Sequence, residues 1–371
     1  MEVHIEDLRL AYNGVPAIRD LSLTIGDGES IVLLGQSGCG KTSTMRCVAG
    51  LEEPTGGSIR IGDRAVFDAA ANINIPSHKR NVGMVFQSYA VWPHKTVLEN
   101  VVFPLRMKKV GRREARAEGL KTLELVGLGH LADRGASLLS GGQMQRVALA
   151  RSMAMKPSVL MLDEPLSNLD ARLRDDLRVE LRRIQVEQGL TSLYVTHDQQ
   201  EALALADRIA IMRDGVIAQL GTPQQIYSTP ASAAIASFLG VTNVFPVTAT
   251  HSANRVTLTE HPLELAVDDP IEYPESSACI RPDDVDVRPR ETRIGERNRF
   301  GGEVTVAVFQ GASIRYQVKL ANGPVIDAIC PQNAHGVLAV GTAVDVSIDP
   351  ASIMVLPNEV PEVRASERVA A

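Results

Sequence analysis

The sequence predicts an α/β domain followed by a smaller all-β domain, and three observations lead to this prediction. Short apolar runs alternate with helix-like segments through about the first 240 residues, as in a parallel sheet whose strands are joined by helices. From roughly Asn243 the helical periodicity fades, and short β-rich pieces separated by turn residues follow. A length of 371 residues is typical of two domains, or three.

Composition is that of an ordinary globular protein, with 44% hydrophobic and 22% charged residues. The net charge of −6 gives no support for a nucleic-acid partner. No apolar run is long enough to span a bilayer, and the charged, strand-like N-terminus MEVHIEDLRLAY does not resemble a signal peptide. The four cysteines show no CxxC spacing, so we expect reduced thiols in a cytoplasmic protein and no zinc site.

The first expected element is a hairpin, because LRLAY and LSLTI flank an Asn13-Gly14 pair. SIVLLG then has the continuous apolar character of a buried parallel strand. Further strands are expected at VGMVFQ, SVLMLDEP, TSLYVTHD and RIAIMRDG, with helices between them. One of these helices, RLRDDLRVELRRIQVEQG, carries an apolar stripe opposite a charged, solvated face, formed by Leu173, Leu177, Leu181 and Ile184.

The C-terminal part is expected to form a small barrel or sandwich. Its β-rich pieces are RVTL, LELAV, SACIR, GEVTVAVF, SIRYQVKL and VDVSI. The tail LPNEVPEVRASERVAA is expected to be frayed.

The segment GQSGCGKT, from Gly35 to Thr42, fits the phosphate-loop pattern and lies between a predicted strand and a predicted helix. Glycines let the backbone N–H groups wrap around a phosphate. We expect Lys41 to reach the β- and γ-phosphates and Thr42 to ligate Mg²⁺. Cys39, inside this loop, is either a reactive thiolate that bound nucleotide protects or an unreactive loop cysteine.

Two carboxylates, Asp163 and Glu164, end the predicted strand SVLMLDEP, where ligands bind in α/β sheets. Asp163 is expected to hold Mg²⁺ through water, and Glu164 to act as the general base toward an attacking water. His197 ends another strand and is expected to contact the γ-phosphate. Asp198 and Glu201 are interpreted as the N-cap and capping partner of the next helix.

Two features near the middle of the chain remain open at this stage. Gln87 ends VGMVFQ and either coordinates Mg²⁺ or water through its carbonyl oxygen or caps a turn. Trp92, the only tryptophan, either fills a local core or lines a docking groove for another protein. Thr96 and Glu99, which follow, are expected to form a capping box.

A second anion-binding helix start is predicted at LLSGGQMQRVALARSM, where Ser140 and two glycines precede a helical pattern. Taken with the motifs above, LSGGQ (139–143) and SNLD (167–170) make the chain resemble the nucleotide-binding subunit of an ATP-binding-cassette (ABC) transporter. The motifs occur in that family's order across about two thirds of the chain. The resemblance implies a phosphate-loop ATPase fold with an inserted helical subdomain, at about residues 90–157.

The resemblance also implies a site shared between two chains, with ATP on the phosphate loop of one and under the LSGGQ helix of the other. Glu164, His197 and Gln87 are the implied catalytic residues, and Thr42, Gln87 and Asp163 the implied Mg²⁺ ligands. Tyr12 is expected to stack on adenine, although an ordinary edge-strand tyrosine is the alternative. The implied ATP contacts are Tyr12, Gly35, Gln36, Ser37, Gly38, Cys39, Gly40, Lys41, Thr42, Ser140, Gly141, Gly142, Gln143 and Asp170.

The β-rich region resembles the OB-like regulatory extension of bacterial importer ATPases, on the strength of IRPDDV (280–285) and FLGVTNVF. The implied domains are 1–240, 241–358 and a tail, 359–371. The implied assembly is a homodimer on the cytoplasmic face of the membrane, bound to permease subunits and indirectly to a solute-binding protein. Ferric iron, polyamine, phosphonate and sugar are the expected solute classes, with SYAVWPHKTVLENVVFPLR closest to the first three.

Two other functions are weighed against an importer ATPase. A soluble ABC ATPase of translation or DNA repair would usually carry two cassettes or long coiled coils, which this chain lacks. A non-catalytic regulator would not need Glu164 and His197.

Overall fold

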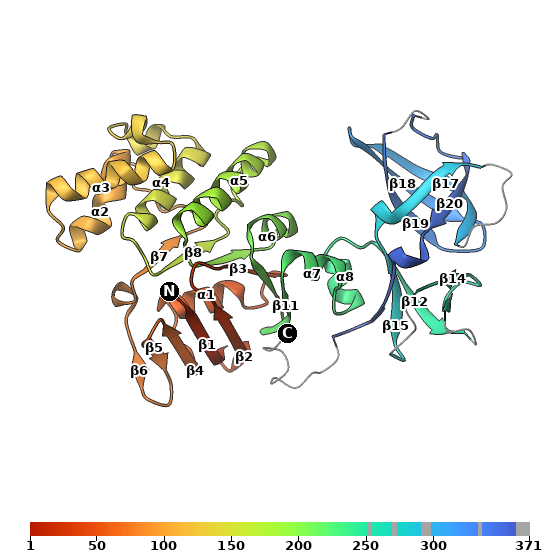
Figure 1. Ribbon diagram of the computed structural model, residues 1–371, viewed down its shortest axis with the longest axis horizontal. Coiled ribbons are helices and arrows are strands. Elements are labelled where there is room, and N and C mark those ends of the chain that lie inside the picture. The colour runs from red at the N-terminus through yellow and green to blue at the C-terminus, as the bar shows by residue number, and fades with distance from the viewer. Residues whose placement is uncertain (251–253, 269–272, 291–297, 333–335, 361–371) are drawn as a thin grey trace. The chain divides into compact units, whose positions relative to one another are not determined.

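The computed structural model describes residues 1–250, 254–268, 273–290, 298–332 and 336–360 (Figure 1). The chain forms two compact units that divide between Ile226 and Tyr227. As predicted, the first is α/β and the second is built on β-strands. The boundary after residue 240 and the extent of the helical subdomain remain predictions, and residues 361–371 of the expected tail lie outside the described residues.

A six-stranded sheet lies at the centre of the first unit. Its strands are β3 (Ser30–Gly35), β7 (Val82–Val85), β8 (Val159–Asp163), β9 (Ser192–Thr196), β10 (Arg208–Arg213) and β11 (Val216–Gly221), in the order β11-β10-β3-β9-β8-β7. All neighbours are parallel except β10 and β11. The carboxyl ends of β3, β7, β8 and β9 therefore meet at one edge, where ligands bind in such sheets.

A second, antiparallel sheet is formed by the N-terminal part of the chain. Its strands are β1 (Val3–Tyr12), β2 (Val15–Ile25), β4 (Gly56–Ile61), β5 (Arg64–Asp68) and β6 (Ile73–Asn74), in the order β2-β1-β4-β5-β6. The predicted hairpin between β1 and β2 is confirmed. Asn13 and Gly14 have φ of 51° and 82°, which is the geometry that a two-residue type I′ turn requires.

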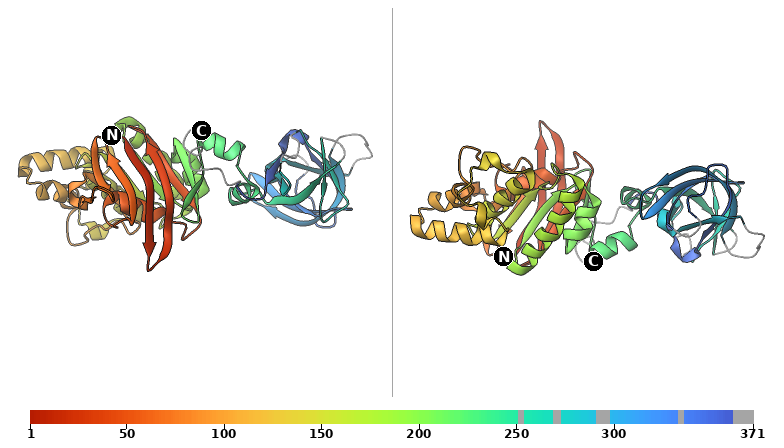
Figure 2. Two further views of the ribbon diagram at one scale, coloured as in Figure 1. Left: turned by 90° about the horizontal axis from the view of Figure 1, so that it is seen from below. Right: turned by 90° about the horizontal axis from the view of Figure 1, so that it is seen from above.

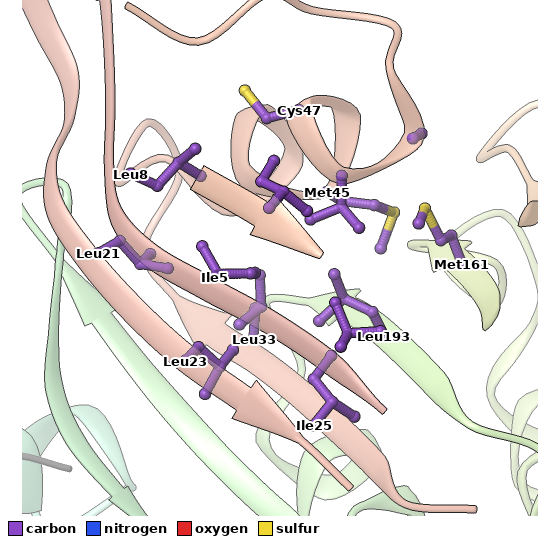
Figure 3. Packing of buried hydrophobic residues seen from close by; sticks show 14 of the residues in the cluster. Ile5, Leu8, Leu21, Leu23, Ile25, Leu33, Met45, Cys47, Met161 and Leu193 are labelled. Carbon is purple, nitrogen blue, oxygen red and sulfur yellow. The ribbon is translucent and has the colours of Figure 1, made fainter. Parts of the chain in front are cut away.

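The core of the first unit lies between these two sheets, around α1 (Lys41–Ala49). Met45 and Cys47 of α1 are fully buried among residues of both sheets, such as Ile5 and Leu193 (Figure 3). Helices α5 (Ala171–Gln188) and α6 (Gln199–Leu205) cover the opposite face of the six-stranded sheet (Figure 2). This packing holds the phosphate-loop helix in a fixed position beneath the edge where the strands end.

Three helices pack together between β7 and β8 in the sequence, as the predicted helical subdomain requires. They are α2 (Val97–Met107), α3 (Arg112–Leu125) and α4 (Gly141–Met153). Short 3₁₀ turns occur at η1 (Ser77–Lys79), η2 (Gly129–Leu131) and η3 (Ala136–Leu138). In the described part of the chain, no helix is long and apolar enough to cross a membrane.

Helices α2 and α5 agree with the sequence prediction, and α6 differs from it in part. The predicted capping box of Thr96 and Glu99 begins α2, and three of the four apolar-stripe residues of α5 are buried, with Leu173 half-buried. Asp198 caps α6, but the prediction that Glu201 caps in return is wrong. The Glu201 carboxylate instead accepts hydrogen bonds from Tyr194 and Thr196, because the first turn of α6 faces the buried end of β9.

In its described residues, the second unit contains two five-stranded antiparallel sheets around a shared apolar core, and a smaller buried cluster lies between α8 and β15. The first has the order β14-β13-β12-β15-β21, made of β12 (Asn243–Ala249), β13 (Arg255–Leu258), β14 (Glu264–Ala266), β15 (Ser276–Ile280) and β21 (Ile353–Pro357). The second has the order β16-β20-β17-β18-β19, made of β16 (Val285–Pro289), β17 (Arg299–Phe309), β18 (Ser313–Leu320), β19 (Val325–Pro331) and β20 (Ala343–Ile348).

Short helices complete the chain at α7 (Pro223–Ser228), α8 (Ala233–Phe238), η4 (Pro282–Asp284) and η5 (Pro350–Ser352). The turn η4 lies in the IRPDDV segment that the sequence singled out. Eight of the described strands were not predicted: β4, β5, β6 and β11 in the first unit, and β12, β16, β19 and β21 in the second.

Candidate active site

An open cleft of about 580 Å³ lies beside the carboxyl end of β3 and the start of α1. Its lining contains eight residues that the sequence predicted and two that it missed, Ala17 and Ser43. The predicted residues in the lining are Tyr12, Ser37, Gly38, Gly40, Lys41, Thr42, Glu164 and His197. Ser43 follows the motif directly and could have been included for that reason, whereas no local signal marks Ala17.

The phosphate loop depends on a backbone that only glycine adopts easily. Gly40 has φ of 100°, and a Cβ there would lie 2.6 Å from the carbonyl oxygen of Ala17. Lys41 is buried, and its Nζ donates hydrogen bonds to the carbonyls of Gly35 and Gln36, both at 2.8 Å. The loop thus wraps around its own lysine side chain. The Cys39 thiol is buried beside it, with Sγ 3.7 Å from Lys41 Nζ.

Asp163 and Glu164 occupy the end of β8, as predicted. Thr42 Oγ1 donates a hydrogen bond of 3.1 Å to Asp163 Oδ1, which links the phosphate-loop helix to this strand. Burial raises the pKa of the Asp163 carboxyl, because its charged form loses hydration. A buried, desolvated carboxylate next to a hydroxyl is a favourable place for a cation.

The Glu164 carboxylate contacts residues that follow two neighbouring strands. The Glu164 φ of 44° is left-handed, which is rare for a non-glycine residue and common at functional sites. His197 Nδ1 lies 3.1 Å from Glu164 Oε1, and Gln87 Nε2 donates a 3.4 Å bond to Glu164 Oε2. The structure thus brings together Gln87, Glu164 and His197, which follow the ends of β7, β8 and β9 and which the sequence selected for catalysis.

The donor set at this edge fits Mg²⁺. The Thr42 hydroxyl, the Asp163 carboxylate and the Gln87 amide supply oxygen atoms, which Mg²⁺ prefers, and phosphate oxygens usually complete its shell. No cluster of three or more His, Cys, Asp or Glu side chains suited to a metal occurs in residues 1–360 outside the undescribed gaps.

Tyr12 lies at the mouth of the cleft, with 47% of its surface exposed. Its hydroxyl donates to Glu52 and lies 3.3 Å from Ser43 Oγ, so one edge of the ring is held by the phosphate-loop side of the cleft. The sequence missed Glu52, because the pairing joins residues 40 positions apart. The exposed ring remains free to stack on a planar ligand.

The second predicted anion-binding helix is α4. Ser140 is its N-cap and forms a capping box with Gln143. Gly142 packs against Leu173 of α5, since a Cβ at this position would lie 2.8 Å from Leu173 Cδ2 unless that side chain shifted. Neither Ser140 nor its neighbours 141–143 line the cleft described above, and Asp170, the N-cap of α5, does not line it either. Within one chain, therefore, the predicted anion-binding start of α4 does not line the phosphate-loop cleft.

Comparison with known sequences agrees with this geometry. The profile of the ABC transporter family matches residues 18–167, and that of the TOBE domain matches residues 278–356. The Fe(3+) ions import ATP-binding protein FbpC of Rhizobium etli is 43% identical over 340 residues, covering 89% of this chain and 92% of that protein. The trehalose/maltose import ATP-binding protein MalK of Thermococcus litoralis is 49% identical over 238 residues, or 64% of each chain.

A solved structure is similar in fold as well. It is the dimeric structure of a post-hydrolysis state of the ATP-binding cassette MJ0796 bound to ADP and Pi, with a TM-score of 0.52 and 29% sequence identity. The likeness covers 60% of this chain and 98% of that one.

Proposed function

This chain belongs to the family of ATP-binding subunits of ABC transporters and hydrolyses ATP, and we propose that closure and opening of its homodimer power the import of a solute. The observation that carries the proposal is the convergence of Gln87 and His197 on Glu164 beside the phosphate loop. The residue roles below follow from that convergence.

ATP is held by the phosphate loop, residues 35–42. The Lys41 ammonium leaves the carbonyls of Gly35 and Gln36 and binds the β- and γ-phosphates, while backbone N–H groups bind the remaining oxygens. Tyr12 stacks on adenine. Thr42, Asp163 and Gln87 hold Mg²⁺, which, when bound, neutralises charge on the phosphates.

Hydrolysis uses Glu164 as the general base. Glu164 accepts a proton from the water whose oxygen bonds to the γ-phosphorus, and the bond from that phosphorus to the bridging oxygen breaks to release ADP. His197 contacts the γ-phosphate while its Nδ1 keeps Glu164 in place, since the two side chains are 3.1 Å apart. Gln87 orients the water from the opposite side of the carboxylate.

A second copy of the chain completes each site. The N–H groups at the start of α4 and the Ser140 hydroxyl bind the γ-phosphate that lies on the partner's phosphate loop, with Gly141, Gly142 and Gln143 beside it. Asp170 lies at the same interface. Support comes from the absence of residues 140–143 from the cleft lining within one chain and from the dimeric state of the similar solved structure.

The dimer is peripheral to the cytoplasmic face of the membrane and drives permease subunits, which receive solute from a solute-binding protein. Ferric iron is the solute favoured by the comparisons. Two FbpC relatives, from Rhizobium etli and Rhizobium meliloti, match 89% and 86% of the chain, whereas the MalK relative matches 64%. Loss of the chain should therefore abolish ferric iron uptake by cells and leave maltose uptake intact. The reverse result would assign it to sugar import.

The hydrolytic role is tested with Glu164→Gln, which keeps the side chain's shape and removes the base. We expect ATP binding to persist and phosphate release to fall about 10²–10⁴-fold. Glu187→Gln, on the exposed side of α5, is the matched control and should retain full turnover. Near-normal hydrolysis by Glu164→Gln would remove Glu164 from its assigned role.

The importer role is distinguished from that of a soluble ABC ATPase by its partners. Affinity purification of the chain from detergent-solubilised membranes should recover two integral membrane subunits in constant ratio. Recovery of ribosomes or DNA-repair factors instead would favour the soluble ATPase.

A further inference from the structure

Arg151, which the function above does not use, lies near the carboxyl end of α4 and is only 9% exposed. Its Nη1 donates a 2.6 Å hydrogen bond to the Ala90 carbonyl, and its Nη2 donates a 2.8 Å bond to the Tyr89 carbonyl. The same guanidinium lies 4.9 Å from the centre of the Trp92 ring, within cation–π distance. One side chain therefore contacts three of the four residues 89–92, in the loop that follows Gln87.

The backbone that Arg151 holds is strained. Tyr89 and Ala90 have φ of 61° and 49°, so two consecutive non-glycine residues are left-handed. Such conformations are costly and persist only where surrounding contacts hold them. A planar guanidinium can hold two adjacent carbonyls, because its N–H groups diverge in fixed directions, whereas the ammonium of lysine lacks this geometry.

At the start of the same loop, Gln87 contacts the residues proposed to act in hydrolysis. Asn168 Nδ2 donates a 2.8 Å bond to the Gln87 carbonyl, and the Gln87 amide lies 3.4 Å from Glu164 Oε2 and 3.3 Å from Ser167 Oγ. Tyr89 is only two residues beyond Gln87. A change in the left-handed turn would therefore alter the direction from which the Gln87 side chain reaches Glu164.

Burying this cation has an energetic cost that the contacts offset. In the described part of the chain, Arg151 makes no ion pair with a carboxylate, and burial lowers the pKa of its guanidinium. The guanidinium contacts the two carbonyls and the Trp92 ring. The centre of the Trp92 ring lies 4.5 Å from the centre of the Phe103 ring, which belongs to α2. Arg151 thus joins α4, α2 and the Gln87 loop.

We propose that Arg151 is a positioning residue for hydrolysis, which holds residues 89–92 in the conformation that keeps Gln87 against Glu164. The proposal rests on the roles proposed above for Gln87 and Glu164. Of the two roles left open for Trp92, the proposal favours the local core, where its ring covers the guanidinium.

A double-mutant cycle tests whether Arg151 acts through Gln87. Arg151→Lys keeps the charge but loses the paired bonds, and we expect kcat to fall between about tenfold and 100-fold with little change in KM for ATP. In a Gln87→Ala background, Arg151→Lys should cause no further loss. Multiplication of the two effects, or an unchanged kcat in Arg151→Lys alone, would overturn the proposal.

Arg80→Lys is the matched control for this cycle. Arg80 is also buried, at 3% exposure, and donates to the carbonyls of Ile75, Cys47 and Val48, none of which is in the Gln87 loop. Its substitution should lower stability, and any effect on kcat should multiply with that of Gln87→Ala. A purely structural role for Arg151 would give the same pattern as Arg80.

A glycine rescue tests the strain directly. Ala90→Gly adopts the left-handed conformation without steric cost, so it should restore most of the kcat lost in Arg151→Lys. Ser88→Gly is the control, because Ser88 is not left-handed and a glycine there should not restore activity. If Arg151→Lys does not fold, recovery of folding by Ala90→Gly and not by Ser88→Gly supports the proposal. Failure of both glycines, or equal rescue by both, contradicts it.

Trp92 fluorescence separates this proposal from the function on which it rests. Trp92 is the only tryptophan, so its emission in nucleotide-free protein reports on this cluster alone. Arg151→Lys should shift the emission, and Ala90→Gly should reverse the shift. If that happens in a chain whose wild type releases no phosphate from ATP, the cluster stands and the proposed function fails. If the wild type hydrolyses ATP and Arg151→Lys changes neither kcat nor emission, the function stands and Arg151 is not a positioning residue.

Discussion

At the scale of single residues, a buried carboxylate supports the end of the strand that carries His197. Glu201 is 2% exposed, and its Oε2 accepts hydrogen bonds from Tyr194 Oη at 2.9 Å and Thr196 Oγ1 at 2.8 Å. Thr196 Oγ1 also accepts a bond from the Asp198 backbone N–H, so this network holds the residues on both sides of His197. Neither role could be deduced from the DQQE spacing, which is equally typical of a simple helix cap.

The titration of Glu201 gives a pH prediction. Burial raises its pKa above the ordinary value of about 4.3, so the folded chain holds this proton to higher pH than the unfolded chain does. The free energy of unfolding therefore falls as pH rises from the ordinary pKa through the raised one. Glu201→Gln removes this contribution. Unfolding in urea at pH 5 and pH 7.5 should show the variant's stability, relative to wild type, to be greater at the higher pH, and a pH-independent difference would contradict the assignment.

At the scale of elements, α2 and α4 begin with the same reciprocal cap. The α2 cap is saturated internally, because Thr96 Oγ1 accepts from the Glu99 N–H at 3.1 Å and the Glu99 carboxylate accepts from the Thr96 N–H at 2.9 Å. At α4, Ser140 Oγ accepts from the Gln143 N–H at a longer 3.4 Å. The Gln143 side-chain oxygen in turn accepts from the Ser140 N–H at 3.0 Å, so the α4 cap is reciprocal like that of α2.

The α2 cap allows a stability prediction that does not depend on function. Thr96→Ala removes the cap acceptor and should lower the free energy of unfolding by about 1 kcal/mol. Thr96→Ser keeps a hydroxyl in the same place and should retain most of that stability. Thermal unfolding of both variants provides the measurement, and equal losses in the two would show that the methyl group, not the cap, is what matters.

At the scale of the whole molecule, the phosphate loop and the LSGGQ helix are both complete, yet residues 140–143 do not line the chain's own cleft. The proposed sharing of each site between two chains accounts for this arrangement. A mixed dimer tests it, with Lys41→Ala in one chain, Ser140→Arg in the other, and Glu164→Gln in both to prevent turnover. Both lesions then fall in one shared site, and the other site stays intact. We expect about one occluded ATP per mixed dimer and almost none in either homodimer.

The control for the mixed dimer carries both lesions in one chain and none in the other. If the sites are shared, each site of this control is damaged once, and it should retain less ATP than the mixed dimer. If each chain used its own two motifs, the undamaged chain would keep its site and the order would reverse. Counting occluded nucleotide in the two dimers decides between these arrangements, because a general loss of cooperativity would not reverse their order.

Local sequence patterns predicted an element correctly where the residues that define it lie within a few positions of one another. The Asn13-Gly14 hairpin, the buried run of β3 and the Thr96–Glu99 box are of this kind. The four strands missed in the second unit each contain or end in proline, at Pro246, Pro289, Pro331 and Pro357. Proline lowers the expectation of a strand because it cannot donate to the ladder, and β16, β19 and β21 tolerate it as edge strands. The strands missed in the first unit, β4, β5, β6 and β11, contain no proline and were missed for lack of a clear pattern.

The sequence by itself determined the α/β and β halves, the phosphate loop and the identities of the residues at the strand ends, because periodicity and motif spacing are local properties. Only the tertiary structure decided which side chains meet. The strand order places Gln87 and His197 on Glu164, and α4 carries Arg151 to the loop after Gln87. The antiparallel N-terminal sheet places Tyr12 of β1 against Glu52, which follows α1. These contacts join positions tens of residues apart, and sequence spacing carries no information about such distances until the sheets and helices are packed.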